Sequence, residues 1–102
     1  MNYSQVFSRI RELCSGGSAV DIDRVMAYLN DEVELPVTKA VDFYLGMVSN
    51  PEGIGRIEYH LFNGTPIRRN FATLFFARRN DWHLVNEAVR LGLVDHTQAY
   101  SR

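Results

Sequence analysis

Apolar residues recur every three or four positions along most of this chain, which is the spacing that places side chains on one face of an α-helix. Glycine, proline and asparagine interrupt the pattern at short intervals, so it predicts several short helices rather than one long helix. The predicted segments are residues 3–14, 19–30, 36–48, 66–79, 82–91 and a last short turn at 96–100. The sequence therefore predicts an all-α fold, a compact bundle of five or six short helices forming one domain over residues 1–102.

Residues 65–79 form the segment around which we expect the other helices to pack. Thr65 can cap the helix, and Pro66 fits the first turn, where a missing N–H has no intrahelical partner to lose. The apolar residues fall on two sides of this helix, namely Ile67, Phe71, Leu74 and Phe75 in one stripe and Ala72 and Phe76 on the far side. A helix that is apolar on two sides is usually covered on both. Its arginines should then emerge at its edges.

Residues 53–64 allow two interpretations. As a helix, the segment has an apolar face, although Gly53 and Gly55 each weaken it by about 1 kcal/mol. As a strand, it shows alternating side chains followed by Asn63-Gly64, a strong hairpin signal, and would make the fold an α+β winged helix. The proline after this turn and the helical pattern beyond it disfavour a second strand. We favour the helix.

Composition limits the functional classes. Apolar residues make up 46% of the 102 residues and charged residues 23%, both ordinary for a globular protein. Cys14 is the only cysteine, so the chain forms no internal disulfide and no cysteine-based zinc cluster. No apolar run approaches the ~20 residues of a membrane span, and the start does not resemble a signal peptide. We expect a soluble, cytoplasmic protein without membrane attachment.

Known catalytic motifs do not occur in the sequence. It contains no glycine-rich phosphate loop and no Gly-x-Ser-x-Gly elbow. His83 and Glu87 have the spacing of a metal-binding pair on one helix face, but the sequence supplies no third or fourth ligand. We therefore expect no catalytic residue, no metal site and no cofactor.

Charge is distributed unevenly along the chain. Residues 1–50 carry four basic and seven acidic residues, whereas residues 51–102 carry seven basic and five acidic residues. Ten of the eleven basic residues are arginine, the side chain best suited to carboxylates, phosphates and aromatic faces. The candidate binding residues are Arg56, Arg68, Arg69, Arg78, Arg79 and Trp82. They form either a binding edge or a solvated rim paired with nearby acidic residues.

Nucleic-acid binding is the alternative use of this edge, because arginines beside aromatic side chains can hold phosphates and stack on bases. The sequence pI of about 6.3 lies well below the value above ~9 that is typical of dedicated nucleic-acid domains. Residues 19–30 and 36–48 could also form a helix-turn-helix. The outward face of the second helix offers one positive charge, Lys39, where a recognition helix needs basic or amide side chains.

A local resemblance concerns residues 64–95. Small residues, a tight turn, an apolar pair and a closing glycine follow one another there, as Gly64-Thr65-Pro66-Ile67, Phe76-Ala77, Leu84-Val85, Ala88-Val89, Gly92 and Asp95. This order resembles one ankyrin-type helical hairpin, and the resemblance implies protein binding. We therefore expect a non-enzymatic helical module whose partner is another protein, with a small nucleic-acid-binding regulator as the alternative.

Overall fold

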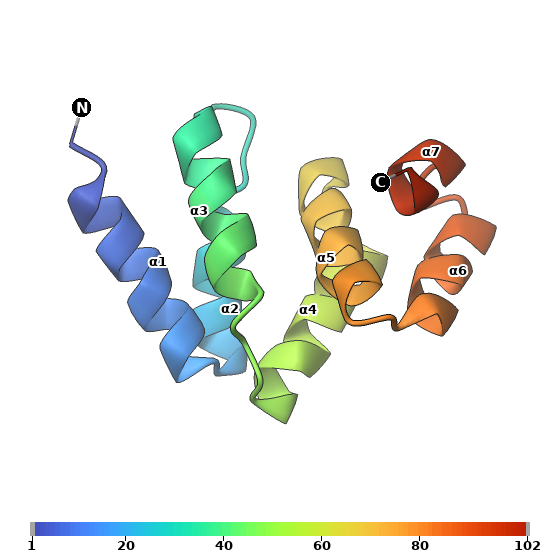
Figure 1. Cartoon of the computed structure of the whole chain (residues 1–102), viewed down its shortest axis with the longest axis horizontal. Coiled ribbons are helices and arrows are strands. Elements are labelled where there is room, and N and C mark those ends of the chain that lie inside the picture. Colours follow the sequence, from blue (N-terminus) through green and yellow to red (C-terminus); the bar gives the residue numbers. More distant parts are fainter. Residues whose placement is uncertain (1, 102) are drawn as a thin grey trace. The chain divides into compact units, whose positions relative to one another are not determined.

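The computed structural model describes residues 2–101, and every regular element in that part of the chain is a helix (Figure 1). The helices are α1 (Ser4–Gly16), α2 (Ala19–Ala27), α3 (Leu35–Leu45), α4 (Pro51–Asn63), α5 (Pro66–Arg78), α6 (Trp82–Arg90) and α7 (His96–Tyr100). The all-α prediction is confirmed. The described residues form seven helices because the short segment after Asp95 is helical as well.

The ambiguous segment is helical in the structure, as α4. The carbonyl of Asn50 accepts the Ile54 N–H at 2.9 Å, and the Asn50 side chain accepts the Glu52 N–H at 2.9 Å. A Cβ on Gly53 would lie 2.5 Å from the carbonyl oxygen of Gly17, so this glycine permits close packing that offsets its low helix propensity. The winged-helix alternative is wrong, because residues 2–101 contain no strand.

Helix boundaries follow local signals. Ser18 begins α2 with a capping box, in which its hydroxyl accepts the Asp21 N–H at 3.1 Å and its own N–H donates to the Asp21 carboxylate at 3.3 Å. Gly17 ends α1 in the left-handed conformation, with φ of 65°. Thr65 occupies the N-cap position of α5, but its side chain accepts no capping hydrogen bond, which corrects the predicted role.

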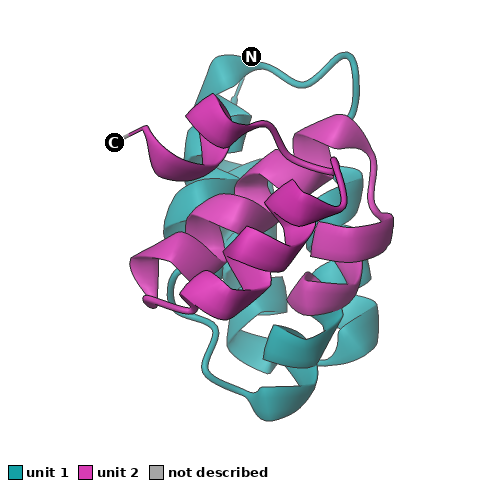
Figure 2. Ribbon diagram, turned by 90° about the vertical axis from the view of Figure 1, so that its right-hand side faces the viewer, with its two compact units in different colours: residues 1–56 teal, residues 57–102 magenta. Residues whose placement is uncertain are grey.

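The chain divides into two units, residues 1–56 and residues 57–102, coloured separately in Figure 2. In the first unit α1 packs against both α2 and α3. The most deeply buried apolar residues of these helices are Ile10, Leu13, Ile22, Val25, Met26, Val41 and Leu45. In the second unit α5 packs against both α6 and α7. The prediction placed this helix at the centre of the whole chain, and the contacts observed here concern residues 57–102.

The buried face of α5 differs from the predicted stripe. Phe75 and Phe76 are buried, whereas Phe71, Ile67 and Leu74 are only half-buried. The remaining buried residues are Ala72, Thr73 and Ala77, all in the C-terminal half of the helix. Helices α6 and α7 follow this end of α5 in the chain and pack against it. Periodicity identified the helix but not the half of it that its neighbours cover.

Candidate interaction surfaces

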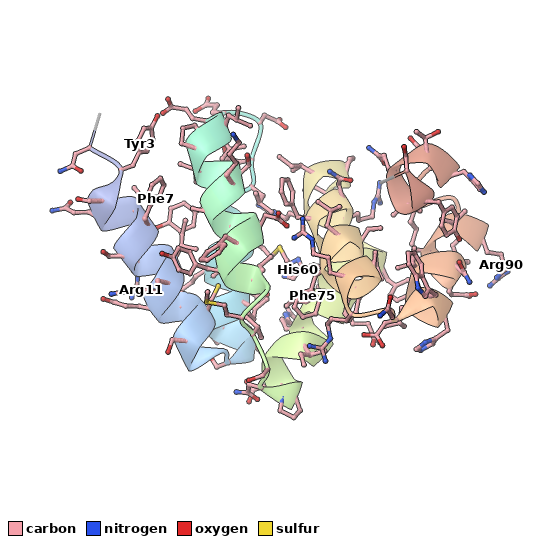
Figure 3. All side chains as sticks on the ribbon, in the orientation of Figure 1. Tyr3, Phe7, Arg11, His60, Phe75 and Arg90 are labelled. Atoms are coloured by element: carbon pink, nitrogen blue, oxygen red, sulfur yellow. The ribbon has the colours of Figure 1, made fainter. Side chains whose placement is uncertain are left out.

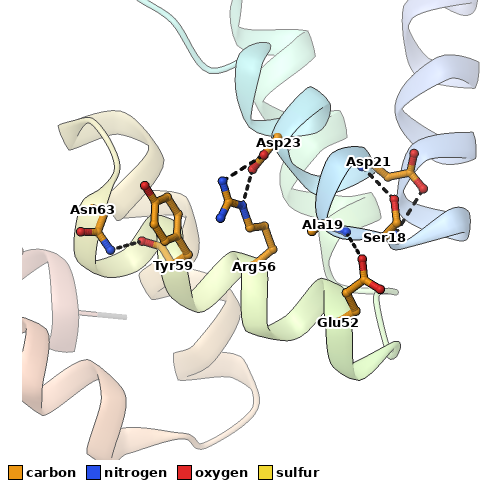
Figure 4. A network of polar contacts seen from close by, with 8 residues as sticks. All are labelled: Ser18, Ala19, Asp21, Asp23, Glu52, Arg56, Tyr59 and Asn63. Carbon is orange, nitrogen blue, oxygen red and sulfur yellow. Dashed lines mark hydrogen bonds and ion pairs between the residues drawn. The ribbon is translucent and has the colours of Figure 1, made fainter.

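Arg56 is held in an ion pair within the first unit. Its Nε donates to Asp23 Oδ1 at 2.7 Å and its Nη2 donates to Asp23 Oδ2 at 3.1 Å, so α4 is joined to α2 by two parallel bonds (Figure 4). One turn earlier on α4, the Glu52 carboxylate accepts the Ala19 N–H at 2.7 Å. The predicted binding residue Arg56 therefore has a structural role in this unit.

The other predicted arginines lie at the two ends of α5. Arg68 and Arg69 are half-buried in its first turn, and Arg69 Nε is buried without a hydrogen-bond partner within residues 2–101. Arg78 and Arg79 are exposed at its C-terminal end, where positive charge complements the helix dipole. Roughly 15 Å of helix separates Arg69 from Arg79. The structure thus divides the predicted arginine cluster into separate groups.

Arg79 and Trp82 lie beside the turn that joins α5 to α6. The Arg79 guanidinium lies 5.3 Å from the Phe75 ring centroid, and its Nε is 3.5 Å from the Asp81 carboxylate. Trp82 is 37% exposed and stacks on Tyr100, with the ring centroids 6.2 Å apart. We call Arg78, Arg79, Asp81 and Trp82 the α5–α6 edge. It combines exposed charge with a partly exposed aromatic ring.

A groove between α1 and α3 was not predicted from the sequence. Its volume is about 390 Å³, and it lies entirely within residues 1–56. The lining residues come from the end of α1, the end of α3 and the segment before α4: Arg11, Cys14, Ser15, Tyr44, Met47, Ser49 and Asn50. We call this the α1–α3 groove. Figure 3 labels Arg11 on α1, one turn beyond Phe7.

One large exposed apolar side chain, Met47, lines this groove, and a second, Phe43, lies next to it. Phe43 and Met47 are each 60% exposed and lie four residues apart, about one helical turn. Met47 lines the groove, and the Phe43 ring meets the ring of Tyr44, another lining residue, edge-on at a centroid distance of 5.1 Å. Exposed apolar side chains gathered at a hollow are typical of an interaction site. In the sequence, both residues fall outside the three-and-four spacing of Val37, Val41, Leu45 and Val48, and this spacing could have indicated that they are exposed.

The charge of the α1–α3 groove comes from Arg11 alone among its lining residues. This side chain is exposed, and within residues 2–101 it forms no ion pair. Burial, and to a smaller extent the nearby Asp21 carboxylate, raises the pKa of the Cys14 thiol to about 12. Cys14 is therefore protonated at neutral pH and acts as an apolar wall rather than a nucleophile. The groove suits a ligand that carries a carboxylate beside an apolar group.

His83 and Glu87, which have the spacing of a metal-binding pair, both lie on α6. Glu87 accepts a 2.8 Å hydrogen bond from Arg90 Nε, and this bond lowers the pKa of the Glu87 carboxyl. Within residues 2–101 the structure brings together no group of three or more histidine, cysteine, aspartate or glutamate side chains that could hold a metal ion. Among the same residues, no helix has both the length and the apolar character needed to cross a membrane.

Comparisons with known proteins do not place this chain in a family. No protein-family model matches it, and no curated protein sequence and no solved structure gives a significant match. The description of its function therefore depends on the surfaces described above.

Proposed function

We propose that this protein is a cytoplasmic, non-enzymatic helical interaction module that binds another protein through the α1–α3 groove. The supporting observation is that Met47, which is 60% exposed, lines a hollow of about 390 Å³, and that Phe43, equally exposed, contacts the lining residue Tyr44. Covering a large apolar side chain that is exposed to this extent contributes about 1–2 kcal/mol. Binding of a partner that covers both side chains is therefore favoured, because it removes their apolar surface from water.

The charge of the groove favours a particular kind of partner. Arg11 can pair with a carboxylate while Met47 and Tyr44 contact an apolar side chain next to it. A polyanion such as nucleic acid is disfavoured here, because Arg11 is the only basic residue that lines the groove and a run of phosphates needs several. The expected ligand is a short acidic and apolar segment of a protein, docked into the groove between two helices.

Affinity capture from a cell extract tests this proposal. The bait is the parent chain, the Met47→Asp variant or the Val20→Ser variant. Val20 is a matched control because it is 56% exposed in the same unit but does not line the groove. Met47→Asp should lose the captured protein, since its new carboxylate occupies Arg11 and repels an acidic ligand, whereas Val20→Ser should retain it. Identical capture by all three baits would refute the proposal.

The second candidate function is nucleic-acid binding at the α5–α6 edge. It is favoured by the Arg79 guanidinium over the Phe75 ring beside the partly exposed Trp82, a combination that suits phosphate contact and base stacking. Trp82 is the only tryptophan, so its fluorescence reports binding of single-stranded DNA or RNA directly. Affinity should fall steeply with salt and disappear in the double variant Arg78→Glu, Arg79→Glu with unchanged thermal melting, since both side chains are exposed at this edge. Fluorescence that is insensitive to nucleic acid at low salt would exclude this candidate.

A further inference from the structure

We propose that the α1–α3 groove accepts the acidic segment of residues 31–35 from a second copy of this chain, so that copies associate head to tail. This inference rests on the proposed function, because it uses the same groove. The ligand of the groove is then a segment that the chain itself contains, residues 31–35.

The segment of residues 31–35 has the chemistry that the groove requires. It joins α2 to the first residue of α3 and presents three exposed acidic side chains, Asp31, Glu32 and Glu34, of which Glu34 accepts a 2.7 Å hydrogen bond from the Tyr3 hydroxyl. Leu35 follows them and is 65% exposed, more than any other exposed large apolar residue of the described chain. A carboxylate beside an exposed leucine is the combination that Arg11 and the apolar groove wall can bind.

The two surfaces are complementary in charge. Arg11 is the only charged residue lining the groove, and no carboxylate competes for it there. The segment contains no basic residue, and the Asp31 and Glu32 carboxylates form no ion pair within residues 2–101. The whole chain has a net charge of −1, so repulsion between two copies is weak. The repulsion between two copies is therefore too weak to outweigh the local attraction between the groove and the segment.

The positions of the two surfaces require contact between copies rather than within one copy. Leu35 begins α3, and Met47 lies just beyond its last residue, Leu45. The eleven residues of this helix separate the two surfaces by roughly 16 Å. Figure 1 shows the connection before α3 and the end of α1 at opposite ends of that helix. A groove at one end and its ligand at the other define a heterologous contact, which generates open chains or rings.

The contact is small, so the association should be weak. It covers one five-residue segment and one groove, far less than the 1,200–2,000 Å² of a stable interface, and such contacts are transient. We expect self-association to become measurable at roughly 0.1–1 mM.

Complementation between two variants tests the inference by analytical ultracentrifugation. Met47→Asp removes the groove and leaves the segment intact, whereas Leu35→Ser removes the apolar part of the segment and leaves the groove intact. Both positions are at least 60% exposed, so circular dichroism and melting should match the parent. Each variant alone should remain monomeric at 1 mM or thereabouts. An equimolar mixture should form a one-to-one dimer, because one intact groove then meets one intact segment.

The parent and the Val20→Ser control should show an average mass that rises with concentration past the dimer value. A parent that remains monomeric throughout this range overturns the inference. Association of the parent without recovery in the mixture also overturns it. So does association of Leu35→Ser alone, because a symmetric groove-to-groove dimer gives that result. None of these outcomes affects the proposed function, which is decided by capture of a different protein.

Discussion

The two units expose different kinds of surface. Residues 1–56 carry five basic and eight acidic residues, and the described part of this unit, residues 2–56, leaves four large apolar side chains exposed: Val20, Leu35, Phe43 and Met47. Residues 57–102 carry six basic and four acidic residues, and the described part of that unit, residues 57–101, exposes three: Tyr59, Trp82 and Leu91. The arginines of the sequence predicted a binding surface mainly in the second unit, whereas the apolar groove lies in the first.

Local pairing explains part of this difference. In the second unit Arg79 and Arg90 have acidic partners two and three residues away, Asp81 and Glu87. An arginine close in sequence to a carboxylate can pair with it whatever the tertiary structure, and exposed pairs of this kind contribute little to stability. An apolar side chain on the outer face of a helix has no such local partner. For this protein, exposed apolar residues therefore indicate a binding surface better than the number of arginines does.

The largest expected effect concerns the core of the second unit. Phe76→Ala should lower the free energy of unfolding by about 3–5 kcal/mol, because this side chain is fully buried and its removal leaves a cavity. Phe71→Ala should cost less, about 1–2 kcal/mol, because Phe71 is only half-buried. Urea denaturation followed by Trp82 fluorescence measures both. Equal losses would show that the buried face of α5 is the one predicted from periodicity.

Two glycines of α4 allow the effect of close packing on stability to be distinguished from the effect of helix propensity. Gly53→Ala should destabilise by about 1–3 kcal/mol, because the new Cβ would lie 2.5 Å from the Gly17 carbonyl oxygen. Gly55→Ala should instead stabilise by about 0.5–1 kcal/mol, since nothing lies within 4 Å of its Cβ position. Thermal melts of the two variants should shift in opposite directions. A shift in the same direction would argue against close packing of α4 on the α1–α2 turn.

Alkaline pH provides a third test, again in the first unit. Burial raises the folded-state pKa of Cys14 to about 12 from its ordinary value of 9.0, so the folded chain retains the thiol proton at pH values where the unfolded chain has lost it. The resulting stabilisation is complete below pH 9 and is lost as pH rises from there toward 12. In Cys14→Ala the alkaline loss of melting temperature should be shallower. Parallel curves for parent and variant would mean that the thiol is not shielded from water.

The smallest effect is expected at the exposed pair in the second unit. The hydrogen bond from Arg90 lowers the pKa of the Glu87 carboxyl, so the stabilisation is present at neutral pH and is lost as pH falls through that depressed pKa. In Arg90→Gln the Glu87 pKa, measured by NMR titration, should rise toward its ordinary value, with almost no change in melting temperature. A large loss of stability would show that the pair is shielded from solvent.

Local structure was predictable because its causes lie within a few residues. The capping box of Ser18 and Asp21 and the left-handed Gly17 act over three residues or fewer, and they lie at the break between the predicted helical segments 3–14 and 19–30. Residues 53–64 were ambiguous because helical and alternating patterns overlap there. The packing of Gly53 against Gly17, 36 positions earlier in the chain, is not visible in either pattern.

The candidate surfaces also depend on contacts between distant residues, which the sequence pattern does not show. The sequence predicts that the arginines emerge at the edges of α5, and Arg78 and Arg79 are exposed, whereas Arg68 and Arg69 are half-buried. The pairing of Arg56 with Asp23 joins residues 33 positions apart, so it is not visible in the sequence, and Arg56 was predicted to be a binding residue. The α1–α3 groove likewise requires the ends of two helices that are about thirty residues apart in the chain.

The sequence by itself determined the helical class of this protein, most of its helix boundaries and the sign of the charge in each half, because spacing, capping and composition are local properties. The tertiary structure decided which half of α5 is buried, which arginine is paired and where a groove forms. These features depend on contacts between distant segments, whose geometry follows from close packing of whole helices rather than from the preferences of individual residues.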